Sequence, residues 1–135
     1  MHYEFNLVNT RHHAMDDLAS QAVARARDLL LVEHHGRVRV DSCFHYGAVD
    51  ISPKHLVVWV LLTGADDDQL PEWSTPEAAR QRAELDPALV TWMERLRHIV
   101  REEFAAVQWP ATDSVQVLFD SEHRVREGGG WYYFK

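Results

Sequence analysis

Four side chains that could do chemistry lie close together in the sequence, around a predicted turn. Cys43 and His45 come just before the segment DISPKH, which begins with Asp50 and ends with His55. If the chain reverses direction there, an antiparallel pairing can bring the two imidazoles together, and its register decides whether they share a face. Two histidines and a carboxylate can hold a metal ion or act as a base. One hypothesis is therefore a small metal-binding protein or enzyme centred on His45, His55 and Asp50.

Cys43 is a candidate nucleophile, because a thiol needs a neighbouring base and a lowered pKa to react. His45 lies two residues along the same predicted strand and on the same face, but no helix N-terminus is predicted nearby. The sequence favours a small buried side chain over a reactive one. Since Cys43 is the only cysteine, it cannot form a disulfide within the chain, which is typical of a reducing compartment.

Other runs of polar residues and glycines lack the spacing of known sites. The histidines at 12–13 and 34–35 are adjacent, whereas two helical ligands of one metal ion are usually four residues apart. The aspartates at 66–68 do not have the spacing of a calcium-binding loop. The glycines at 128–130 precede a predicted strand, so they do not form a phosphate-binding loop before a helix. The sequence predicts no catalytic residue and no cofactor beyond the hairpin hypothesis.

The composition is that of a globular, acidic protein. The chain has 135 residues, 46% of them hydrophobic, and a formal net charge of −7. Nucleic-acid binders usually have a basic face, so the charge argues against one and suits a basic protein partner instead. The longest apolar run, residues 56–62, is far shorter than the roughly 20 residues that cross a bilayer. The N-terminus has no signal-peptide pattern, so we expect a cytoplasmic protein that does not enter a membrane.

The first half of the chain predicts one helix and a hairpin. Residues 2–9 are predicted to be a short strand or an extended arm. Apolar residues at spacings of three and four predict a helix from Met15, with the histidines at 34–35 at its end and Gly36 as its C′ residue. Residues 37–49 alternate, which predicts a half-buried strand. Residues 55–63 are apolar on both faces, as expected for a central strand. The residues predicted to share one face of the first strand are Val38, Val40, Ser42, Phe44 and Tyr46.

The second half predicts two helices and two more strands. Ser74 or Thr75 is expected to cap a short helix, and Asp86 begins a long helix that ends before Trp109. Residues 115–119 and the aromatic residues 131–134 are predicted strands joined by a polar connection. The prediction is a single α+β domain over residues 1–135, in the order α-β-β-α-α-β-β. A largely antiparallel sheet of four or five strands is expected to carry its helices on one face.

An acidic loop around Trp73 predicts an interaction surface. Tryptophan is enriched at interface hot spots, and carboxylates around it would form an acidic rim. The alternative is that Trp73 packs back on the core and holds the loop in place. The predicted partner-binding residues are Asp66, Asp67, Asp68, Glu72 and Trp73.

The C-terminal third contains the segment MERLRHIVREEFAAVQWPATDSVQVLFDSEHRV, followed by GGGWYYFK. This pattern resembles small bacterial immunity proteins of the YezG type. The resemblance implies a non-catalytic protein that binds and blocks a toxin, and the acidic charge would suit a basic toxin domain. The positions that match the immunity-protein pattern are Leu96, Arg97, Phe104, Trp109, Ser121, Tyr132 and Tyr133.

A third hypothesis is a homo-oligomer that pairs through its aromatic C-terminal strand.

Overall fold

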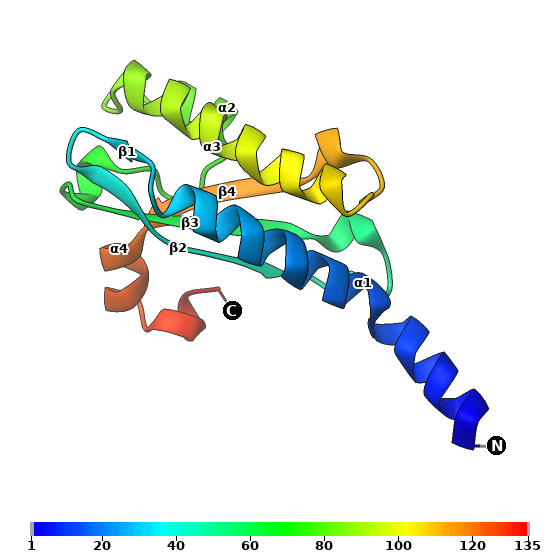
Figure 1. Ribbon diagram of the computed structural model, residues 1–135. Coiled ribbons are helices and arrows are strands. Elements are labelled where there is room, and N and C mark those ends of the chain that lie inside the picture. Colours follow the sequence, from blue (N-terminus) through cyan, green and yellow to red (C-terminus); the bar gives the residue numbers. More distant parts are fainter. Residues whose placement is uncertain (1, 135) are drawn as a thin grey trace.

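The computed structural model describes the backbone of residues 2–134 and the side chains of residues 14–130 and 132–134. Its four strands form one curled, half-barrel sheet in the order β1-β2-β3-β4 (Figure 1). Strand β2 is antiparallel to both β1 and β3, whereas β4 is parallel to β3. The fold is therefore α+β with a mixed sheet. The strands are β1 (His34–His35), β2 (Val38–Tyr46), β3 (Val57–Thr63) and β4 (Gln116–Ser121).

Helices lie on both sides of this sheet, so the prediction that they all pack on one face is wrong. The two long helices, α1 (His2–Leu30) and α3 (Pro87–Ala106), pack together over one face, and the short α2 (Pro76–Arg80) packs on α3. Helix α4 (Glu122–Glu127) and the C-terminal 3-10 helix lie on the other side (Figure 1). None of the described helices is long and apolar enough to span a membrane. The four 3-10 helices are η1 (Pro53–His55), η2 (Asp67–Gln69), η3 (Thr112–Ser114) and η4 (Gly130–Phe134).

The main core fills the space between the two long helices and the sheet. In strand β3, the side chains of Val58, Val60 and Leu62 lie in this core, while Trp59 and Leu61 are buried on the opposite face. This burial on both faces confirms the prediction of a central strand. Below, the face that carries Trp59 and Leu61 is called the outer face.

The predicted helix starts of the second half are confirmed. The Thr75 hydroxyl accepts from the amide of Ala78 at the start of α2, and the Asp86 carboxylate accepts from the amide of Ala88 at the start of α3. Each side chain satisfies an amide that has no partner within its helix. Because both caps are local, they could be recognised in the sequence.

The prediction of a largely antiparallel sheet is wrong at its last strand. After β3 the chain crosses the helical face through α2 and α3 and returns to the end of the sheet where β3 begins. Strand β4 therefore runs alongside β3 in the same direction, and Val57 pairs with Gln116. A helical crossover of this kind is the usual connection between parallel strands.

The predicted strand over residues 131–134 is also wrong, because this segment forms η4 and the connection before it contains α4. Two glycines explain the turn. A Cβ on Gly128 would lie 2.6 Å from Cδ2 of the Tyr133 ring, and Gly129 has a φ of +101°. A residue with a side chain is disfavoured at both positions. The glycines thus fold Tyr133 and Phe134 back onto the outer face.

Residues 2–9 are helical and not extended, and α1 ends at Leu30, before the histidines at 34–35. These histidines form β1, and Gly36, with a φ of +59°, lies in the turn between β1 and β2. Within α1, the amides of Met15 and Asp16 donate to the Asp50 carboxylate at 3.2 Å. Asp50 thus acts like a capping residue where the axis of α1 changes direction (Figure 1).

The predicted faces of β2 are wrong because of a β-bulge. The register with β3 shifts between Val40 and Ser42, so Asp41 is an extra residue. An extra residue reverses which side chains point inward after it. Val38, Val40 and Cys43 therefore face the core.

Candidate protein-binding surface

The hairpin residues that could have formed a metal site have separate partners. Nε2 of His45 lies 3.1 Å from the Asp16 carboxylate, whereas Nδ1 of His55 lies 3.2 Å from the carbonyl oxygen of Ala48. Asp50 is bound to amides of α1. Among the side chains that the structure describes, no group of three His, Cys, Asp or Glu could hold a metal ion. The structure does not bring the predicted set together.

Cys43 is buried against α1, with 2% of its surface exposed. Burial raises the pKa of its thiol to about 12, and the positive charge of Arg27 opposes that rise only in part. The thiolate is the reactive form of cysteine, so at neutral pH Cys43 is an unreactive apolar side chain.

The acidic loop that follows β3 is fastened to the start of α4 through Asp67. The Ser121 hydroxyl donates to one carboxylate oxygen of Asp67, and Nδ1 of His123 lies 2.8 Å from the other. The Ser121 bond is the main cause that lowers the pKa of Asp67; partial burial opposes it and His123 adds to it. The bond to Asp67 in turn raises the pKa of His123. Because Ser121 is fully buried, the Asp67–Ser121–His123 group is structural and not a nucleophilic triad.

The Asp67–His123 contact predicts a pH window in which the loop is held most firmly. A raised His123 pKa means that its contribution is complete below the ordinary value of 6.5 and is lost as pH rises through the folded pKa. A lowered Asp67 pKa means that its contribution is complete above the ordinary 3.8 and is lost as pH falls through the folded pKa. We expect NMR titration to place the His123 pKa above 6.5, and Asp67→Asn to bring it back. An unchanged His123 pKa in Asp67→Asn would contradict this contact.

Asp120 lies at the centre of the contacts that hold the acidic loop, and its side chain is completely buried. Its Oδ2 accepts from the Trp73 amide at 3.1 Å and from the Tyr133 hydroxyl at 2.7 Å. Its Oδ1 accepts from the Ser121 amide at 2.7 Å and from Nη1 of Arg124 at 2.8 Å. A buried carboxylate is tolerated when it is paired and hydrogen-bonded. Asp120 thus joins the acidic loop, α4 and the C-terminal segment at the end of β4.

Arg124 makes a second set of bonds to the same loop. Its guanidinium donates to the carbonyl oxygen of Pro71 at 2.9 Å and to that of Asp67. The planar guanidinium can bind several acceptors at once, which a lysine ammonium cannot do with the same geometry. The loop is therefore held at its beginning and near its end by one side chain.

Trp73 is held in one orientation and is still partly open to solvent. Its backbone is left-handed, with a φ of +48°, and 48% of its surface is exposed. Its ring packs edge-to-face on Trp59 at a centroid distance of 4.6 Å, and it also contacts Tyr133 and Phe134. Trp73 therefore packs back on the protein, as the second reading predicts, while about half of its surface faces outward. Its role in partner binding stays a prediction.

The C-terminal segment extends the aromatic surface across the sheet. Phe134 contacts Trp59, Phe44 and Tyr46 at centroid distances of 4.8 to 5.6 Å. Beside it lies an open, almost entirely apolar hollow of about 330 Å³ on the outer face. We call the hollow and the exposed side of Trp73 the aromatic surface. The residues that line the hollow are Phe44, Tyr46, Leu61, Val125, Gly130 and Phe134.

No family model, curated protein or solved structure matches the chain.

The predicted acidic residues differ in their availability to a partner. Asp66, Asp68 and Glu72 are exposed, whereas Asp67 is partly buried in its contacts with Ser121 and His123. Glu72 lies near enough to Tyr133 to raise the pKa of its hydroxyl, although burial and the bond to Asp120 have larger effects. Glu72 therefore lies beside the aromatic surface, and Asp66 and Asp68 are exposed further back on the same loop. These three carboxylates are called the acidic border below.

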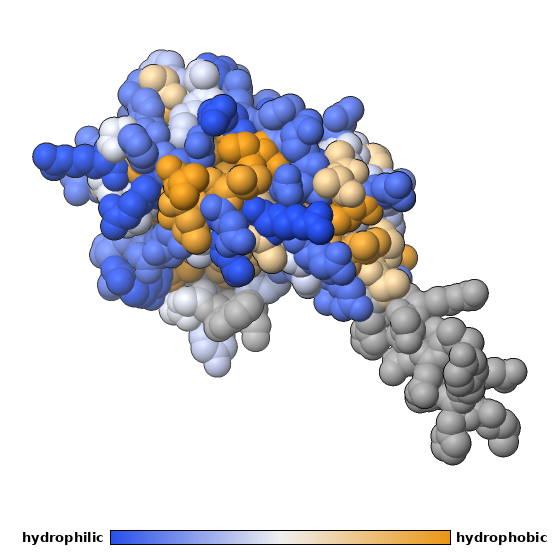
Figure 2. Space-filling model, viewed as in Figure 1, coloured by the Kyte–Doolittle hydropathy of each residue, from blue (hydrophilic) through white to orange (hydrophobic). Residues whose placement is uncertain are grey.

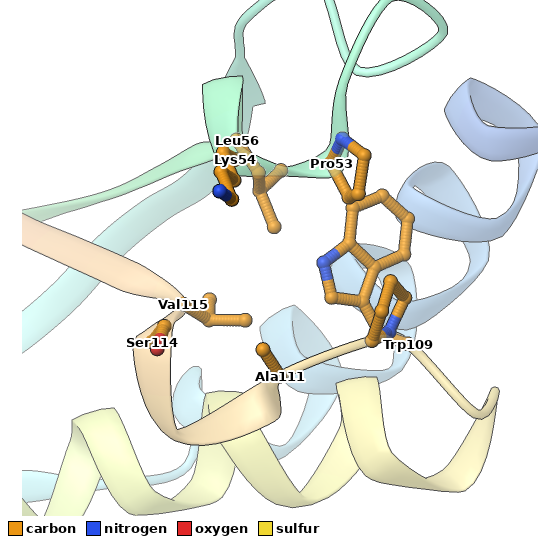
Figure 3. A pocket seen from close by; sticks show the side chains of 8 residues that line it. Pro53, Lys54, Leu56, Trp109, Ala111, Ser114 and Val115 are labelled. Atoms are coloured by element: carbon orange, nitrogen blue, oxygen red, sulfur yellow. The ribbon is translucent and has the colours of Figure 1, made fainter.

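Other parts of the molecule offer less chemistry. A hollow of about 130 Å³ lies between η1 and η3, where Trp109 and Val115 approach Pro53 and Leu56 (Figure 3). Among the described residues that line this hollow, Lys54 alone is ionisable. Apolar side chains also appear among charged ones on the face that carries α1 (Figure 2). Leu29, Leu31 and Val32 are exposed at the end of α1, but they carry no polar group that could orient a ligand.

The sequence locates the acidic loop but does not indicate what holds it. It predicts a polar connection that contains Asp120, His123 and Arg124, and a strand that contains Tyr133. One local signal was present, since Ser121 caps α4 by accepting from the Arg124 amide. Serine followed at once by glutamate is a typical helix start. The contacts of Asp120 with residues 47 positions earlier and 13 later have no such local signal.

Proposed function

We propose that the protein is a non-catalytic binding protein that recognises a basic protein partner through the aromatic surface and its acidic border. The observation that carries the proposal is the rigid mounting of a half-exposed tryptophan. Trp73 is fixed through its amide by buried Asp120 and through its ring by Trp59. A preorganised aromatic anchor loses little conformational entropy on binding, as in protein interface hot spots.

Charge supports a basic partner. The chain carries a net charge of −7, and Asp66, Asp68 and Glu72 are exposed on the loop that leads to Trp73. Carboxylates at the rim of an interface mainly speed association with a basic partner, while a central aromatic group provides affinity. The acidic charge and the resemblance of the C-terminal third to YezG-type immunity proteins together favour an immunity protein. Such a protein would bind and block a basic toxin domain in the cytoplasm.

The experiment has two stages. A tagged protein is first used to capture its partner from the native host, and the purified pair is then studied by surface plasmon resonance. We expect Trp73→Ala to weaken binding by roughly 30-fold or more, because truncation of a hot-spot residue costs about 2 kcal/mol or more. A Trp73→Ala protein that binds the partner as tightly as the wild type would contradict the proposed surface.

The acidic border is tested separately with Asp66→Asn, Asp68→Asn and Glu72→Gln in one protein. Asp67 is left unchanged because it holds the loop. We expect an association rate about tenfold lower at low ionic strength, with a smaller salt dependence and little change in dissociation. The matched control removes three exposed charges elsewhere, with Asp17→Asn, Glu102→Gln and Asp113→Asn. Equal effects in the two proteins would mean that only net charge matters, and the acidic border would not be part of the site.

A further inference from the structure

The two edges of the sheet differ. On β4, Phe119 exchanges two backbone hydrogen bonds with Ser74, at 2.8 and 3.0 Å, and the Arg101 guanidinium donates to the carbonyl oxygen of Val115. This edge is therefore covered from within the chain. On β2, by contrast, the short β1 pairs only with Val38 and Arg39. Within the described chain, no strand lies along the outer edge of β2 from Val40 to His45.

An uncovered edge of this length can pair with another strand, and proteins usually cover or block such edges. The bulge at Asp41 blocks only the first part, so Ser42 to His45 remain regular. The side chains there are not those of a blocked edge: Cys43 is buried and Phe44 is half-buried beside the apolar hollow. The edge thus has main-chain groups and one partly exposed apolar side chain, Phe44, to offer.

The two ends of this edge carry opposite charges: negative side chains lie near the end of β2, and positive ones lie towards its start. Asp16 of α1 lies beside the end of β2, at 3.1 Å from His45. Arg27 lies further along α1, close enough to Cys43 for its charge to act on the thiol. These two residues are about three helical turns apart, so they lie on the same side of α1. Arg39 near the start of β2 and Asp50 after its end repeat this order.

We propose that a second copy of this chain pairs with β2, antiparallel, across a two-fold axis near Cys43 and Phe44. In such a pair, Asp16 of one copy faces Arg27 of the other, and each contact occurs twice. The sheets join into one, the two α1 helices lie side by side, and Phe44 gains an apolar neighbour. Phe44 lines the hollow of the aromatic surface and would lie at this seam, whereas Trp73 packs on Trp59 of β3, one strand further from the seam. The proposal rests on the open edge of β2 and not on the proposed function.

The first measurement is the mass in solution, by light scattering or sedimentation over about 1–100 µM. We expect twice the 15.7 kDa of one chain. Asp16→Arg alone and Arg27→Glu alone each place like charges opposite each other twice, and we expect each to weaken the dimer roughly tenfold or more. The double variant Asp16→Arg/Arg27→Glu restores opposite charges and should restore the dimer.

The rescue by the double variant distinguishes the proposed pairing from a loss of folding. Because Asp16→Arg also breaks the contact with His45, circular dichroism must show that each variant is folded. Asp113→Arg, an exposed change beside η3, is the matched control and should leave the mass unchanged. A wild-type monomer over the whole concentration range would overturn the proposal. A dimer that the single variants leave intact, or that the double variant fails to restore, would overturn it as well.

Discussion

We expect Asp120→Ala to lower the free energy of unfolding by about 3–5 kcal/mol, the usual cost of removing one partner of a buried ion pair. The carboxylate accepts four hydrogen bonds in a site with no exposed surface. Its removal leaves the partly buried Arg124 without its carboxylate and leaves the Tyr133 hydroxyl without an acceptor. The loss should therefore exceed that of a typical point mutation, about 1 kcal/mol.

Urea unfolding followed by tryptophan fluorescence measures this effect, because Trp73 and Trp59 both lie in the affected region. Tyr133→Phe is the matched control: it removes one of the four hydrogen bonds and keeps the ring, so we expect a loss of about 1 kcal/mol. If Asp120→Ala costs no more than Tyr133→Phe, the carboxylate does not organise the surface, and the rigid mounting of Trp73 would need another explanation.

The sequence is informative where structure depends on neighbouring residues. The caps at Thr75 and Asp86 and the apolar run of β3 were predicted correctly, because each pattern is local. The acidic loop with Trp73 could also be located, since loops carry clusters of polar residues. Its role in partner binding stays a prediction.

The sequence is less informative where distant residues decide. One extra residue at Asp41 reverses the faces of β2, and no local pattern marks it. The aromatic residues at 131–134 have strand propensity, but the glycines before them and the Tyr133–Asp120 bond place Tyr133 and Phe134 on the outer face. Propensity is a weak indicator when tertiary contacts of this kind compete with it.

We expect Gly64→Ala to destabilise the protein by about 3 kcal/mol or more, and to displace the acidic loop. Gly64 follows β3 directly and has a φ of +101°, which residues with a side chain rarely adopt. A Cβ there would lie 1.9 Å from the carbonyl oxygen of Arg37. Since the obstacle is backbone and not a flexible side chain, either the turn after β1 or the start of the loop must move.

Gly36→Ala is the matched control, because Gly36 also has a positive φ, +59°, but a Cβ there would have no heavy atom within 4 Å. Only the backbone preference is lost, so we expect about 1 kcal/mol. Thermal unfolding measures the stability of both variants.

A displaced loop should also bring the His123 pKa towards its ordinary value and weaken partner binding in Gly64→Ala alone. Equal stability losses would show that backbone preference, and not the contact with Arg37, sets the start of the loop. A stability loss without a change in the His123 pKa would show that Asp67, Arg124 and Asp120 hold the loop in place independently of its start.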